Sequence, residues 1–319
     1  PMNKKIDHMF TMSRLLVVAG KGGVGKTTVT AVIARASADA GLRVLVVTLD
    51  SRPGLAALLG GSPSDGADYD GTMIQTHLGA AKTGSIQMRT VTAGEALQDY
   101  LATQGLALLA KRLVSSGVVG VVASAAPGID DLLVLGKLKH LVGLTGPDGD
   151  HDLIIVDGPA AGHAISFLQA PAAMAETISG GPLRSQAIEV RSMLQDPQKC
   201  RVVMVTTPET TPVNELIETT EKLTQSVGVA FAPVIVNGVD ISSEVSSLVA
   251  SGEIPDGVLG DAMRYRATRS ALHLQAIDRV HERMAVGSFA LPHIATASLQ
   301  AHDVVVLADI MRKAVGEPA

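Results

Sequence analysis

The residues best suited to chemistry form a glycine-rich segment near the amino terminus, Gly20–Thr27, which reads GKGGVGKT. It matches the phosphate-binding pattern G-x-x-x-x-G-K-[S/T], whose backbone N–H groups curl around a β-phosphate. An apolar run, Leu15–Ala19, precedes it and a helical pattern, Thr28–Ala40, follows it. The amino end of that helix would add about half a positive charge. We therefore predict an ATP-binding loop rather than an ordinary glycine-rich turn, with contacts from Gly20, Gly22, Gly23, Val24, Gly25, Lys26, Thr27 and Thr28.

Side chains in and beyond this loop have the types that phosphoryl transfer requires. We expect Lys26 to pair with β- and γ-phosphate oxygens and to act in catalysis, and Thr27 to ligate Mg²⁺. Asp157 follows the apolar run Leu153–Val156, where a carboxylate can hold Mg²⁺ through water. The sequence thus predicts ATP or ADP and Mg²⁺ as cofactors.

A second aspartate, Asp50, follows the apolar run Val44–Leu49. Its spacing from the loop suits a catalytic residue that orients or deprotonates the attacking water. The alternative is an N-cap for a helix that begins near Pro53.

The elements that must position these residues are short apolar runs alternating with helical patterns. We expect an α/β fold with a doubly wound, mostly parallel sheet and helices on both faces, because runs rich in Val and Ile predict buried parallel strands. The ligand then lies beyond the carboxyl ends of the strands. The predicted strands are Leu15–Ala19, Val44–Leu49, Leu153–Val156, Val202–Thr206 and Val234–Val236, with Phe289–Ile294 at an edge or strand end and a closing helix over Asp303–Ala314.

We expect one domain over residues 1–319 with helical additions to the sheet. Gly60–Gly84 is rich in Gly, Ser and Asp and predicts a mobile loop or loose connection. Ala93–Leu144 has an approximate apolar stripe and predicts a helical insertion, and Ile165–Leu194 predicts a second helical part broken at Gly180–Pro182.

Composition limits the function classes. Apolar residues make up 46% and aromatic residues 2%, so a sizeable core must be aliphatic. The net charge of −5 argues against nucleic acid as a partner. The only cysteine, Cys200, argues against a zinc or arsenite site and fits a small buried apolar residue in a cytoplasmic protein. The most apolar stretch, Gly117–Gly136, contains proline and aspartates and predicts a buried helical hairpin rather than a membrane span.

A resemblance to a known family rests on further residues. The segment Asp157–His163, followed by Phe167–Leu168, is similar to the second switch of the arsenite-pump and tail-anchored-protein-targeting ATPases. The likeness is nearest to the bacterial, chiefly actinobacterial, branch known as anion-transporting ATPases, and includes Thr207–Glu209. It implies that Asn237 contacts adenine, where a strand-end turn residue is the alternative. The implied switch residues are Gly158, Pro159, Gly162 and His163.

Lys21, directly after the first glycine, resembles the extra lysine of the deviant Walker A ATPases. In that group the lysine reaches the partner subunit's nucleotide, so the resemblance implies a catalytic role in trans and a homodimer or a heterodimer with a paralogue. A solvated loop lysine is the alternative.

Two departures from the family pattern affect the switches. The first switch here reads Asp50-Ser51-Arg52-Pro53 and lacks the family's histidine. The second lacks both of the family's threonines, and His163 either couples the switch to the helical layer or is a core histidine.

Three functions remain open. The first is a dimeric ATPase whose nucleotide state opens and closes a helical layer. This layer would bind a partner, such as an apolar helix or a membrane-protein client. The ATPase would be cytoplasmic or would reach the membrane through that partner. Its client groove would be rich in Met and Leu, but Met88, Met174 and Met193 are scattered along the sequence. The second is a P-loop kinase or ligase-like enzyme acting on a small metabolite. The third, a membrane-positioning ATPase, has only a faint basic signal at Met311–Lys313.

Overall fold

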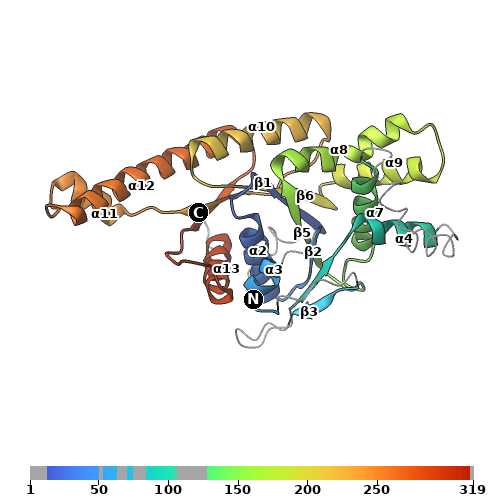
Figure 1. Cartoon of the computed structure of the whole chain (residues 1–319), viewed down its shortest axis with the longest axis horizontal. Helices are drawn as coiled ribbons and strands as arrows, with labels where there is room; N and C mark the ends of the chain where they lie inside the picture. Colours follow the sequence, from blue (N-terminus) through green and yellow to red (C-terminus); the bar gives the residue numbers. More distant parts are fainter. Residues whose placement is uncertain are drawn as a thin grey trace.

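The computed structural model describes residues 13–49, 53–62, 70–74, 84–103, 105 and 128–316. Within them an eight-stranded sheet has the order β3-β4-β2-β5-β1-β6-β7-β8 (Figure 1). All neighbouring strands are parallel except β3, which is antiparallel to β4 at one edge. The prediction of a mostly parallel, doubly wound sheet is confirmed. The strands are β1 (Leu15–Gly20), β2 (Arg43–Thr48), β3 (Thr72–Ile74), β4 (Ser85–Thr90), β5 (Leu153–Ala160), β6 (Cys200–Thr206), β7 (Val234–Val239) and β8 (Ser288–Pro292).

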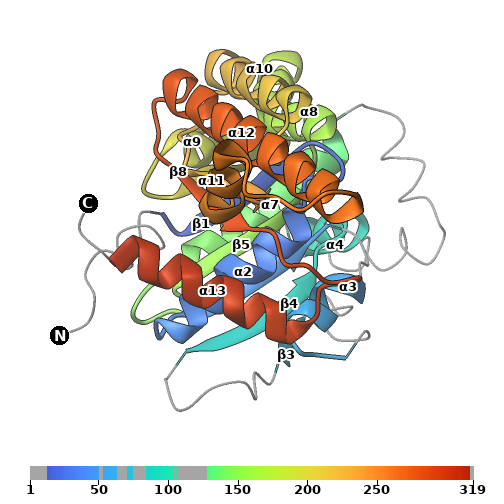
Figure 2. The ribbon, with the colours of Figure 1, turned by 90° about the vertical axis from the view of Figure 1, so that its left-hand side faces the viewer.

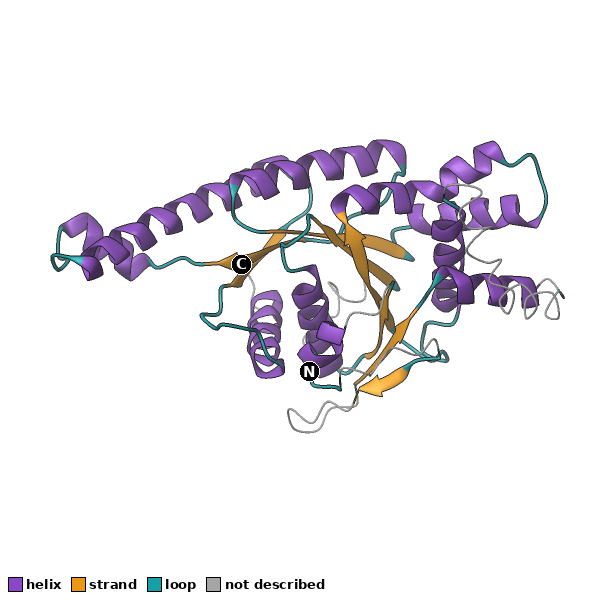
Figure 3. Cartoon of the chain, viewed as in Figure 1, coloured by secondary structure: helices purple, strands orange, loops and turns teal. Residues whose placement is uncertain are grey.

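Helices cover both faces of this sheet (Figure 3). One face carries α2 (Lys26–Asp39), α3 (Pro53–Leu58) and α13 (Ala301–Gly316), and α13 runs alongside α2 (Figure 2). The other carries a larger layer, in which α4 packs on α7 and α11 packs on α12. Its helices are α4 (Ala93–Thr103), α7 (Ile129–Gly143), α8 (Ala161–Thr177), α9 (Pro182–Gln195), α10 (Thr210–Ser226), α11 (Ser243–Ser251) and α12 (Val258–Arg283).

Alternation along the central strands supplies both cores. Leu15 and Val17 of β1 enter the core beneath α7 to α10, whereas Leu16 and Val18 enter the core beneath α2 and α13. Successive side chains of a strand point to opposite faces, so an unbroken apolar run fits a strand covered on both sides. The core is aliphatic, as its composition predicts.

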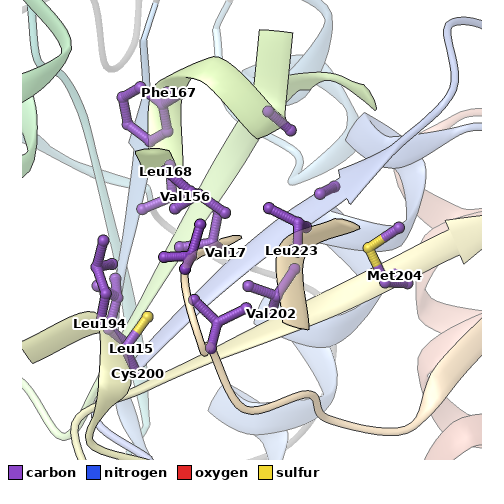
Figure 4. Close-up of a cluster of buried hydrophobic side chains, with 14 of the residues drawn as sticks. Leu15, Val17, Val156, Phe167, Leu168, Leu194, Cys200, Val202, Met204 and Leu223 are labelled. Atoms are coloured by element: carbon purple, nitrogen blue, oxygen red, sulfur yellow. The ribbon is translucent and has the colours of Figure 1, made fainter. Parts of the chain in front are cut away.

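Cys200 lies in this core, close to Leu15 and Leu194 (Figure 4). It is fully buried, and desolvation raises the pKa of its thiol to about 12. The prediction of a small buried apolar residue is confirmed, and the thiol is unreactive at neutral pH.

Several predicted elements need correction. Gly60–Gly84 was expected to lack regular structure, but β3 lies within it, and β4 directly after it was not predicted. Ser85–Thr90 alternates buried and half-buried residues, and its Ile-Gln-Met-Arg alternation is the signal that could have identified this strand. Strand β5 continues to Ala160 and β7 to Val239, so Asp157 and Asn237 lie inside strands rather than after them.

Four described helices overlap the two ranges that were expected to be helical. Helices α4 and α7 lie in the predicted insertion, and α8 and α9 meet at the expected break near Gly180. Residues 106–127, which include most of the predicted hairpin, lie outside the described residues. Helices α10, α11 and α12 were not predicted. None of the helices described in ranges 13–103 and 128–316 is long and apolar enough to span a bilayer.

Candidate nucleotide-binding site

The glycine-rich loop connects the central strand β1 to α2. Gly20 ends β1, and a Cβ atom on it would lie 2.3 Å from the carbonyl oxygen of Val205 on β6, so only glycine fits. Gly23 and Gly25 have φ angles of 88° and 87°, a region that favours glycine. Gly25 is the N-cap of α2, and no side chain caps this helix. The amino end of α2 is therefore left without a side-chain cap, an arrangement that suits anion binding by the backbone N–H groups.

Beneath the loop, a hydroxyl and a carboxylate meet. Thr27 Oγ1 donates to Asp157 Oδ2 at 2.9 Å, and Thr30 Oγ1 donates to Asp157 Oδ1 at 3.3 Å. The contact arises because β5 lies beside β1, with Asp157 in register with Val18. Sequence reasoning missed Thr30, although its position three residues after Thr27 puts both hydroxyls on one face of a helix.

Lys26 is buried in the first turn of α2. Its Nζ donates to the backbone carbonyl of Lys21 at 3.1 Å. The ammonium group therefore lies across the same loop whose N–H groups are predicted to hold phosphates. Thr28 follows in the same turn, and Val24 is buried under the loop.

Lys21 makes an ion pair that the sequence did not suggest. Its Nζ donates to Glu215 Oε1 of α10 at 2.6 Å, and the two side chains remain 41% and 40% exposed. In this conformation the lysine binds within its own chain rather than extending from it. No sequence signal distinguishes Glu215 from the other acidic residues of α10.

Asn237 supports the loop from β7. Its Nδ2 donates to the carbonyl of Val24 at 2.9 Å, and a Cβ atom on Gly25 would lie 2.2 Å from that nitrogen. The asparagine therefore fixes the loop's conformation and depends on glycine at position 25. This contact was not predicted, and it leaves the predicted adenine contact untested.

The second switch begins inside β5 and enters α8. A Cβ atom on Gly158 would lie 2.3 Å from the carbonyl oxygen of Val18, so this strand pairing requires glycine, whereas a Cβ atom on Gly162 would meet open space. Pro159 is half-buried, and His163 is exposed. The alternative of a core histidine is therefore wrong for His163.

His163 is electrostatically coupled to α7. Burial raises the pKa of Asp131, the charge of Asp130 raises it further, and nearby His163 partly offsets both effects. The start of α8 therefore lies close enough to the start of α7 for His163 to act on the Asp131 carboxyl.

Asp50 and its two successors lie outside the described residues, so its catalytic role stays a prediction. In the parts of the chain that are described, no three His, Cys, Asp or Glu side chains cluster closely enough to hold a metal ion.

The chain has the three features that define a P-loop nucleotide-binding protein. These are a mostly parallel sheet, a glycine-rich loop from its central strand to a helix, and a carboxylate on the adjacent strand. Residues 13–180 match the family described as anion-transporting ATPase. The chain therefore belongs to the anion-transporting ATPase family.

Similarity to individual relatives extends over much of the chain. It is 32% identical over 227 residues to ATPase BagA of Mycobacterium tuberculosis, a match that covers 70% of this chain and 64% of BagA. It is 27% identical over 268 residues to an arsenical pump-driving ATPase of Escherichia coli, covering 81% of this chain and 40% of that protein. The match thus spans less than two thirds of either relative.

Proposed function

We propose that this chain binds ATP with Mg²⁺ at the Gly20–Thr27 loop and hydrolyses it to ADP and phosphate. The observation that carries the proposal is the 2.9 Å hydrogen bond between Thr27 Oγ1 and Asp157 Oδ2 at the amino end of α2. Oxygen ligands of these two kinds are the ones that hold Mg²⁺ beside β- and γ-phosphates. Open space around Gly22 and Gly23 fits a loop that wraps a phosphate.

Each residue of the proposed site has a distinct task. With nucleotide bound, Lys26 would exchange the Lys21 carbonyl for phosphate oxygens, and Thr27 and Asp157 would hold Mg²⁺. Mg²⁺, when bound, supplies charge neutralisation on the phosphates. Asp50 orients the attacking water.

The proposed enzyme acts as a dimer, with identical subunits or a paralogue. Lys21 would leave Glu215 and reach the partner's nucleotide, where a cation supplied in trans stabilises the transition-state charge. Support comes from its position after Gly20 and from the exposure of the ion pair, which makes it easy to separate.

Nucleotide state is proposed to act on the helical layer. The second switch leads into α8, which packs on α7, α9 and α10, and His163 couples to Asp131. A cavity of about 620 Å³ lies between α4, α7 and α9, with Lys137 paired to Asp99 at its wall. The walls of this cavity are partly polar and partly apolar, and no methionine is among the described residues that line it. Met88, Met174 and Met193 are core residues, so we propose a partner-binding layer without specifying a methionine-lined client groove.

The negative net charge disfavours nucleic acid as that partner. The single buried cysteine favours a cytoplasmic location, with any membrane contact made through the partner, and disfavours the zinc and arsenite sites of relatives.

The deciding experiment is a product balance. Purified chain is incubated with MgATP and no added metabolite, and ADP and free phosphate are measured together. Equal amounts of ADP and phosphate, lost in Lys26→Ala, support hydrolysis. No phosphate release without an added acceptor, with ADP formed once a metabolite is supplied, would instead support the P-loop kinase alternative.

A further inference from the structure

Thr30 lies in α2, one helical turn after the proposed magnesium ligand Thr27. Its side chain is fully buried, and its Oγ1 donates to Asp157 Oδ1 at 3.3 Å. Thr27 donates to the other carboxylate oxygen, Oδ2, at 2.9 Å. Residues three positions apart lie on one face of a helix, so two hydroxyl groups of α2 hold the two oxygens of one carboxylate.

The sheet directs Asp157 toward α2. Leu153 and Ile155 of β5 enter the core beneath α2, and alternation along the strand places Asp157 on the same face. Its neighbour on β2 is Thr48, whose hydroxyl is bonded to Thr90 Oγ1 at 2.9 Å. Asp157 is only 5% exposed. Burying a carboxylate is costly unless hydrogen bonds compensate it, and α2 supplies two of these bonds.

The direction of the Thr30 hydroxyl differs from that of other helical threonines in this chain. A threonine inside a helix commonly donates to the carbonyl of the residue four positions earlier. Among the described residues, four do so at 2.8 or 2.9 Å: Thr177, Thr220, Thr224 and Thr268. Thr30 instead donates across to β5. Its side-chain conformation is therefore committed to Asp157.

We propose that Thr30 is a positioning residue for the metal site, because its bond to Oδ1 holds the Asp157 carboxylate in the orientation that binds Mg²⁺. This inference rests on the proposed function, in which Thr27 and Asp157 hold the ion. The Thr27 hydroxyl is then shared between the carboxylate and the metal, whereas the Thr30 hydroxyl serves Asp157 alone. Partners that orient metal ligands in this way typically change metal affinity by about 10- to 100-fold.

A purely structural role for Thr30 is the competing explanation. Removing a buried hydrogen-bond donor lowers the free energy of unfolding whatever its function, so stability does not separate the two roles. The dependence of nucleotide binding on Mg²⁺ does, since a structural role would weaken binding equally with and without the metal.

Calorimetry with the non-hydrolysable ATP analogue AMP-PNP measures this dependence, in EDTA and over a series of Mg²⁺ concentrations. Thr30→Val removes the hydroxyl and keeps the branched shape of the side chain. It should raise the half-saturating Mg²⁺ concentration about tenfold and leave binding in EDTA near the parental value. Thr30→Ser, which keeps a hydroxyl, should stay near the parental value in both conditions.

Thr220→Val is the matched control. Thr220 is also buried in a helix, but its hydroxyl donates to the carbonyl of Leu216 at 2.8 Å. This variant should leave the half-saturating Mg²⁺ concentration unchanged. If Thr30→Val leaves it unchanged too, or if Thr30→Ser raises it as much as Thr30→Val, the hydroxyl of Thr30 does not position the metal site and the proposal fails.

A double-mutant cycle tests whether Thr30 acts through Asp157. Asp157→Ala should itself weaken the dependence on Mg²⁺, and adding Thr30→Val should then have no further effect. An undiminished effect of Thr30→Val in the Asp157→Ala chain would overturn the proposal. Should Thr30→Val not fold, Thr30→Ala provides the same comparison.

Failure of the proposed nucleotide site would look different. The parental chain would then bind AMP-PNP no better with Mg²⁺ than in EDTA, or would not bind it at all, and both proposals would fall. A parental chain that binds with Mg²⁺, together with a Thr30→Val chain that responds to Mg²⁺ identically, would overturn only the role of Thr30.

Discussion

The ion pair between Lys21 and Glu215 leads to a quantitative prediction. Before Lys21 can reach a partner's nucleotide, its ammonium group must leave Glu215 Oε1, 2.6 Å away. Glu215→Gln keeps the size of the side chain but removes the charge, so it should release Lys21 and raise the ATPase rate.

The structure limits the size of this increase. Both side chains are about 40% exposed, and exposed ion pairs contribute about 0.2–1 kcal/mol. At about 1.4 kcal/mol per factor of ten, the rate should rise by about 1.4-fold to fivefold. Lys21→Ala should instead suppress hydrolysis by about a thousandfold while ATP still binds, because the cation acts on the transition state.

The assay is phosphate release at protein concentrations below dimer saturation, with ATP affinity measured by calorimetry. Glu218→Gln, an exposed change on the same helix, is the matched control. Combining Glu215→Gln with Lys21→Ala should give no increase over Lys21→Ala alone. If the increase persists in that double variant, or if Glu215→Gln lowers the rate, Glu215 does not act through Lys21.

A mixing experiment tests delivery of Lys21 in trans. Inactive Lys21→Ala chains mixed with inactive Asp50→Asn chains should regain part of the activity, because some mixed dimers contain one complete site. No recovery in a mixture shown by native mass spectrometry to exchange subunits would argue for a cis role or a plain loop lysine.

The remaining predictions concern binding, turnover and stability. Lys26→Ala should remove most ATP affinity in calorimetry, and unchanged affinity would contradict the phosphate-binding role. Asp50→Asn should keep MgATP binding but slow turnover, and a parental rate would leave Asp50 as only a helix cap. Gly158→Ala should lower the free energy of unfolding by about 1–3 kcal/mol because its Cβ meets backbone, whereas Gly162→Ala should not. Burial lowers the pKa of His273 in the folded protein, so the unfolded state binds a proton on this side chain more readily. The free energy of unfolding should therefore fall as the pH drops below about 6.5. In denaturant unfolding experiments, His273→Gln should weaken this dependence of the free energy of unfolding on pH.

Much of the fold could be predicted because its signals are local. A Val- and Ile-rich run such as β1 is buried on both faces and shows its nature in six residues. Strand β4 was missed because it lies near the sheet's edge, where polar residues interrupt the apolar ones. Helix α12 was missed because its buried positions include Gly260, Ser270 and His273 rather than large apolar residues.

The residues of the candidate site also fall into two groups, those with a local sequence signal and those whose contacts only the tertiary structure shows. The sequence by itself indicated the family and predicted the phosphate-binding loop, since the pattern for such a loop is encoded in eight consecutive residues. Only the tertiary structure paired Lys21 with Glu215, 194 positions away, and seated Asn237 on the loop at Val24, 213 positions away. The physical reason is that these contacts depend on the order of strands in the sheet and on which helix faces remain uncovered, and neither is encoded in a local pattern of residues.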